Sequence, residues 1–151
     1  MRDLLMSFVY AFAGIKRCII SERNFRIHIT AAVTVFIFGA LYGLNDVRLA
    51  LLTLTCVLVC ALEAVNTAIE AEVDILSPER SELAKTAKDT AAAAVLVSAI
   101  GALVVAVVMF SDVSRLLAVF ARLFTMPLLV PVLIYLAACV FFVFGVGRKQ
   151  R

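Results

Sequence analysis

The chain has 151 residues, a net charge of +3 and 64% hydrophobic residues. Its mean hydropathy of +1.09 is far too apolar for a soluble domain of this size, and several runs approach the roughly 20 residues that span a bilayer. The few charges are spread over the loops, which argues against a nucleic-acid-binding face. We expect an all-α, polytopic membrane protein.

Apolar residues recur at helical intervals in the first 20 residues. They predict an amphipathic helix that lies on the membrane surface, and Lys16 and Arg17 argue against a signal peptide. After a polar stretch, the first hydrophobic span runs from Ile29 to Leu44. Within the polar stretch we interpret Arg23 and Arg26 as ordinary positive-inside residues.

The second span follows a turn at Asn45 and Asp46. It runs without a charge from Leu49 to Leu62 and continues as helix into a run of carboxylates. Ser77 and Pro78 end this helix, and a polar loop follows to Asp89. Glu63 is therefore expected near the inner membrane boundary.

The third span extends from Thr90 to Phe110. Residues 111–126 are predicted to form a second amphipathic segment, and 127–147 a fourth span interrupted by Pro131. With a cytoplasmic N-terminus, all but three of the 14 Lys and Arg residues fall on the inner side. The three outer ones are Arg48, Arg115 and Arg122. We expect a plasma-membrane protein of four spans with both termini in the cytoplasm.

Four polar side chains share one helical face at the inner end of the second span. Glu63, Asn66, Glu70 and Asp74 fall within about a quarter of the helix circumference at 100° per residue, whereas Glu72 points away. Ionisable groups at membrane depth are costly, and they are functional-site hypotheses by default. The alternative is an interhelical polar network that fixes assembly.

Three polar blocks converge on the predicted cytosolic side: Glu22, the carboxylate face, and the group of Lys85, Lys88 and Asp89. Two carboxylates from different segments suit Mg²⁺, and lysines beside them suit a polyphosphate. A further, partly desolvated carboxylate can accept a proton from a hydroxyl. This combination favours phosphoryl transfer, outside the P-loop class because no GxxxxGK[ST] occurs. The four cysteines lack metal-site spacing and are interpreted as packing thiols.

The blocks SFVYAFAGI, ERNFRIH, EAVNTAIEAEVD and AKTAKDTAAAAVL, in this order, resemble the small bacterial membrane kinases of the diacylglycerol kinase and undecaprenol kinase family. The resemblance covers Ser7 to Ile100. It implies a homotrimer of three-span protomers that uses ATP and Mg²⁺ to phosphorylate a membrane lipid alcohol at composite, cytosolic sites. The first two blocks look closer to the undecaprenol kinases, so undecaprenol is the expected substrate and diacylglycerol the alternative.

The resemblance also implies roles for individual residues. Glu63 resembles the general base, and Ser7 and Asn66 match positions on the lipid-substrate side. Glu22 and Glu70 resemble the Mg²⁺ ligands and also match ATP-binding positions. The remaining ATP-binding positions that match are Tyr10, Glu79, Ser81, Lys88 and Asp89. The role of Asp74 is open, and Asp3 stands where some relatives place a basic residue.

Residues 1–110 are predicted to form the kinase core, and 111–151 exceed the three-span pattern. The extra segment is interpreted as peripheral packing, a trimer collar or a partner contact. A competing hypothesis is a four-span proton-coupled exporter, but that function needs a carboxylate near the bilayer middle, and the acids here gather at one edge. A non-enzymatic assembly subunit, the third option, predicts no dependence on nucleotide.

Overall fold

The computed structural model describes residues 2–77 and 81–147, and within them every regular element is an α-helix. This confirms the predicted all-α class. The helices are α1 (Arg2–Ser21), α2 (Arg23–Tyr42), α3 (Asp46–Leu76), α4 (Glu82–Met109), α5 (Val113–Leu123) and α6 (Met126–Gly145).

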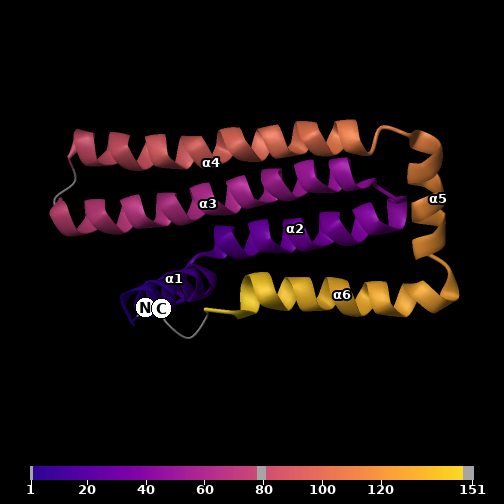
Figure 1. Cartoon of the computed structure of the whole chain (residues 1–151), viewed down its shortest axis with the longest axis horizontal. Helices are drawn as coiled ribbons and strands as arrows, with labels where there is room; N and C mark the ends of the chain where they lie inside the picture. The colour runs from indigo at the N-terminus through magenta and orange to yellow at the C-terminus, as the bar shows by residue number, and fades with distance from the viewer. Residues whose placement is uncertain (1, 78–80, 148–151) are drawn as a thin grey trace.

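Four long helices lie side by side in the order α4, α3, α2, α6 (Figure 1). Helix α5 crosses one end of this layer, and α1 lies obliquely at the other end, where it touches α2 and α3 (Figure 1). The last turn of α3, the first turn of α4 and the last turn of α6 lie at the same end as α1 (Figure 1). We call this the inner end and the α5 end the outer end.

The helix lengths indicate which parts leave the bilayer. Helices α2 and α6 have 20 residues each, or about 30 Å at 1.5 Å per residue, which matches the hydrocarbon core. Helix α3 has 31 residues and a length of about 46 Å, and its inner end extends past α2 together with that of α4 (Figure 1). Five helices, including α1, are long and apolar enough to cross a membrane. Four of them, α2, α3, α4 and α6, lie alongside one another (Figure 1).

The predicted turn between the first two spans is confirmed. Gly43 ends α2 in the left-handed region at φ 77°, and its N–H donates to the carbonyl oxygens of Gly39 and Ala40. Asn45 then caps α3, because its side chain accepts a hydrogen bond from the backbone N–H of Arg48. The antiparallel α2–α3 pair follows from these few residues.

Aromatic side chains join three helices at the outer end. The rings of Phe38 and Tyr42 on α2 pack against Phe110, and Phe38 also contacts Phe120 on α5. The Tyr42 hydroxyl accepts a hydrogen bond from the backbone N–H of Asp112 at 3.0 Å and donates to its carbonyl oxygen at 3.3 Å. These contacts hold α5 across the outer end, as an amphipathic surface segment requires.

Three predicted boundaries are wrong. Helix α2 begins at Arg23, not near Ile29, because the polar side chain of Arg26 is buried in the structure. Most of the predicted loop before Asp89 is the start of α4, which Ser81 caps by accepting a hydrogen bond from the N–H of Ala84. Helix α6 continues through Pro131, where only the bond to the carbonyl of the residue four positions earlier is lost.

Candidate active site

Two polar side chains are buried on the inner half of α3. Glu63 is 3% exposed and Asn66 is 7% exposed. The Asn66 Nδ2 donates to Glu70 Oε1 at 3.0 Å, and the Thr67 hydroxyl donates to the Glu63 carbonyl oxygen at 3.0 Å. The predicted polar face therefore exists, and Glu63 lies about 26 Å along α3 from its outer end.

The elbow between α1 and α2 supplies the second segment of the site. Glu22 is its one residue outside the helices, and its N–H donates to the Cys18 carbonyl oxygen at 2.9 Å. Glu22 and Glu70 both lie close enough to Glu63 for their charges to act on its carboxyl group. Carboxylates from two segments thus lie within electrostatic range of Glu63, and the roles predicted for them stay predictions.

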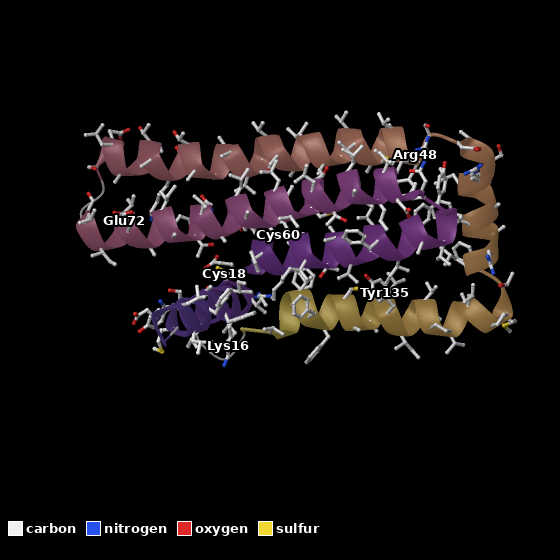
Figure 2. The ribbon with its side chains drawn as sticks, viewed as in Figure 1. Lys16, Cys18, Arg48, Cys60, Glu72 and Tyr135 are labelled. Atoms are coloured by element: carbon white, nitrogen blue, oxygen red, sulfur yellow. The ribbon has the colours of Figure 1, made fainter. Side chains whose placement is uncertain are left out.

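Cys18 also belongs to this site, although the sequence analysis did not identify it. The thiol is buried where α1 meets α3, beside Thr67 and within electrostatic range of Glu22 and Glu63 (Figure 2). A single cysteine in an apolar helix carries no spacing signal. Only the packing of α1 on α3 shows where it lies.

The site offers oxygen atoms of the kind that Mg²⁺ prefers. Asn66 Oδ1 is buried and has no hydrogen-bond partner among the described residues. A buried acceptor of this kind costs free energy unless a ligand or a water molecule interacts with it. In the described ranges no group of three or more His, Cys, Asp or Glu side chains is placed to hold a metal ion by itself. Mg²⁺ is usually held by one or two carboxylates together with substrate phosphates, so Glu22 and Glu70 fit this ion when nucleotide is present.

A second cluster lies where α3 and α4 meet at the inner end. Lys88 Nζ contacts Asp74 Oδ1 at 2.5 Å in an ion pair between the two helices. Ser81, Lys85 and Asp89 line the same hollow of about 610 Å³. The sequence left the role of Asp74 open. In the structure its carboxylate is the ion-pair partner of Lys88.

Glu70 connects the two clusters along one face of α3. Asp74 lies 11 residues beyond Glu63, or about 16 Å along the helix axis, and Glu70 lies between them. Asn66 orients the Glu70 carboxylate from the side of Glu63. A ligand with several phosphates could therefore contact Lys88 and still reach the carboxylates.

Two predicted residues on α1 lie apart from these clusters. Ser7 and Tyr10 are exposed, and the Ser7 hydroxyl donates to the Asp3 carbonyl oxygen of its own helix. They lie 11 and 8 residues before Cys18, or about 16 and 12 Å along α1. A single chain does not bring them to Glu63. Glu79 lies outside the described residues.

The interpretation of Arg26 as an ordinary positive-inside residue is wrong. Its side chain is 5% exposed and donates hydrogen bonds to the carbonyl oxygens of Ile19, Ile20 and Val143. Arg23, by contrast, is exposed. The sequence did not separate the two because the packing of α6 on this region could not be anticipated.

Comparison with known proteins decides the family. The model of the family described as "Prokaryotic diacylglycerol kinase" matches residues 9–110. The chain belongs to the prokaryotic diacylglycerol kinase family. The resemblance noted in the sequence is thereby confirmed. The family match ends where α4 ends, so α5 and α6 lie outside it.

Relatives within the family carry two different names. The chain is 46% identical over 104 residues to a diacylglycerol kinase of Synechocystis sp., a match of 68% of this chain and 59% of that protein. It is 39% identical to the undecaprenol kinase of Bacillus subtilis, over 69% of this chain and 85% of that protein. It is 33% identical to the diacylglycerol kinase of Escherichia coli strain K12, over 63% and 78%. The family is thus one of lipid kinases by name, and the names of these relatives do not agree on the lipid.

Proposed function

We propose that this protein transfers the γ-phosphate of ATP to the hydroxyl group of a membrane lipid at the inner end of the bundle. The observation that carries the proposal is the placement of Glu22 and Glu70, from two segments, within electrostatic range of Glu63. Beside them is a buried Asn66 oxygen that has no hydrogen-bond partner among the described residues. Family membership supports the same chemistry. The position of Glu63 near one membrane boundary disfavours an exporter with a carboxylate at the bilayer middle.

In the proposed reaction, Glu63 accepts the proton of the lipid hydroxyl as the hydroxyl oxygen forms its bond to the γ-phosphorus. The bond from that phosphorus to the bridging oxygen breaks, and ADP leaves with the electron pair. Asn66 holds Glu70 through Nδ2 and presents Oδ1 to a donor in the site, such as the substrate hydroxyl before its proton moves.

The nucleotide is proposed to bind between the two clusters. Glu22 and Glu70 would hold Mg²⁺, which when bound neutralises negative charge on the phosphates. Lys88 leaves its ion pair with Asp74 to contact a phosphate, and Ser81 and Asp89 lie in the same hollow. The ion pair keeps the lysine side chain over the site until the nucleotide arrives.

We propose that the inner end faces the cytosol across the plasma membrane. Lys16, Arg17, Lys85 and Lys88 belong to this end and Arg48, Arg115 and Arg122 to the outer one, as the positive-inside rule requires.

A homotrimer with shared sites is part of the proposal. The separation of Ser7 and Tyr10 from Glu63 supports it, because a neighbouring chain could supply these side chains. The mass of the complex in native mass spectrometry tests the trimer.

Undecaprenol is the proposed lipid, and diacylglycerol is the second candidate. The blocks around Tyr10 and Glu22 favour the polyprenol, and the match spans 85% of the undecaprenol kinase of Bacillus subtilis. The 46% identity to the Synechocystis protein named diacylglycerol kinase favours the second candidate.

The purified full-length chain tests the proposal in mixed micelles with labelled ATP and both lipids offered together. We expect Mg²⁺-dependent transfer of the γ-phosphate to undecaprenol in preference to diacylglycerol. Transfer to diacylglycerol alone would replace the substrate and keep the reaction. No labelled lipid with either alcohol would overturn the proposed function.

A further inference from the structure

We propose that α6 holds in place the elbow between α1 and α2, which carries the proposed metal ligand Glu22. Arg26 is the positioning residue through which α6 acts. This inference rests on the proposed role of Glu22 as a Mg²⁺ ligand. It gives a task to a segment that lies outside the family match and contributes no chemical group to the site.

Arg26 joins the ends of two helices. Its Nη1 donates to the carbonyl oxygens of Ile19 at 2.9 Å and Ile20 at 3.1 Å, in the last turn of α1. Its Nε donates to the carbonyl oxygen of Val143 at 3.1 Å, in the last turn of α6. Carbonyls at a helix C-terminus lack partners within the helix and carry partial negative charge, so one buried cation caps both helices.

The same residue closes the bend that carries Glu22. The Arg26 backbone N–H donates to the Glu22 carbonyl oxygen at 3.3 Å, and the Glu22 N–H donates to the Cys18 carbonyl oxygen at 2.9 Å. The guanidinium reaches back over Glu22 to Ile19 and Ile20. The angle between α1 and α2, and with it the place of the Glu22 carboxylate relative to α3, depends on this side chain.

The end of α6 lies directly against the elbow. Gly147 has φ 85°, and a Cβ atom at this residue would lie 2.5 Å from the Ile20 carbonyl oxygen. That oxygen is also bound by Arg26. Glu22, Arg26, Val143 and Gly147 line one hollow of about 550 Å³ beside it. Only a glycine allows this approach. A substitution of Gly147 should therefore weaken the contact between the end of α6 and the elbow without removing a charge.

The test compares three full-length proteins: wild type, Gly147→Ala and the matched control Gly101→Ala. A Cβ at Gly101 on α4 meets no atom within 4 Å. Hydrogen–deuterium exchange of the metal-free proteins reports on the elbow, and the Mg²⁺ concentration that gives half-maximal kinase activity reports on the metal site. The latter constant does not depend on the fraction of folded protein.

We expect Gly147→Ala to speed exchange at the amides of Glu22 and Arg26. The Mg²⁺ activation constant should rise about tenfold, the usual effect of removing support behind a metal ligand. Gly101→Ala should match wild type in both. Arg26→Lys, which keeps the charge but loses the fork that bridges two helices, should change both readouts in the same direction. It serves as the second variant if Gly147→Ala does not fold.

Wild-type exchange and an unchanged Mg²⁺ constant in Gly147→Ala and Arg26→Lys would overturn the inference. Faster exchange with an unchanged Mg²⁺ constant would show that α6 holds the elbow but that Arg26 does not position the metal ligand, and this too would overturn the inference. A wild-type chain without kinase activity would instead overturn the proposed function, and the exchange comparison would still decide whether α6 holds the elbow.

Discussion

At the scale of single residues, the buried carboxyl of Glu63 is the group on which the proposed chemistry depends. Glu63→Gln keeps the volume and removes the base, so we expect kcat to fall by about 10²- to 10⁴-fold with little change in the KM for ATP. Glu72→Gln is the control, because Glu72 is exposed on the same helix (Figure 2). Steady-state kinetics measure both. A Glu63→Gln enzyme that keeps most of its kcat would remove the assignment.

A second residue-scale prediction separates two lysines of one hollow. Lys88 forms the ion pair with Asp74, whereas no ion pair of Lys85 occurs among the described residues. Lys88→Met should raise the KM for ATP about tenfold or more, the value of a hydrogen bond to a charged group. Lys85→Met should leave the KM near wild type. Equal effects of the two changes would show that only the net charge of the hollow matters.

At the scale of elements, Asp112 makes the start of α5 sensitive to pH. The backbone N–H of Arg115 and the hydroxyl of Ser114 donate to this carboxylate and hold the pKa of Asp112 below its ordinary value. The stabilisation is therefore complete above the unfolded-state value of about 3.9 and is lost as the pH falls through the lower folded-state pKa. Exchange at the Arg115 amide, corrected for the intrinsic rate, should accelerate below about pH 4.

The cap of α3 provides the control for this measurement. Asn45 accepts a hydrogen bond from the Arg48 N–H through an amide that does not titrate. Protection of Arg48 should stay constant over the same pH range. Parallel loss at both amides would mean that the outer end as a whole unfolds in acid, and not that one cap is protonated.

Sequence patterns predicted the existence of the elements better than their starts. Hydropathy patterns located helices α2 to α6, and turn chemistry placed Asn45 and Ser77 correctly. The starts of α2 and α4 were missed because charged residues before an apolar run were interpreted as loop. Arg26 lies in a helix because carbonyl oxygens of other helices accept its hydrogen bonds. One of these partners, Val143, is more than 100 residues away in the sequence.

At the scale of the whole molecule, the placement of the helix ends predicts a testable orientation. Ser111 lies beyond the outer end of α4, and Thr86 lies in its exposed inner turns. A membrane-impermeant maleimide should label Ser111→Cys in intact cells, but Thr86→Cys only after permeabilisation. The wild-type chain, whose cysteines are buried or half-buried, gives the background. The reversed pattern would place the nucleotide site outside the cell and end the proposal.

The candidate site could be predicted in its parts but not in its assembly. One-face spacing gave Glu63, Asn66 and Glu70, the converging polar blocks gave Glu22 and Lys88, and the resemblance implied a role for each. None of these showed that Cys18 lies within electrostatic range of Glu22 and Glu63. Nor did they show that α6 packs on α2 through the paired hydroxyls of Thr34 and Tyr135 at 2.7 Å. Such contacts depend on how helices pack, which one sequence does not encode in a short motif.

The central claim is that Glu22 and Glu70 together hold a divalent cation with nucleotide beside Glu63. Electron paramagnetic resonance of Mn²⁺ in place of Mg²⁺ tests it directly by counting metal bound in the presence of ATP. The account predicts that Glu22→Gln and Glu70→Gln each weaken nucleotide-dependent Mn²⁺ binding about tenfold or more, while Glu72→Gln binds as wild type. Wild-type binding by either of the first two variants would contradict it.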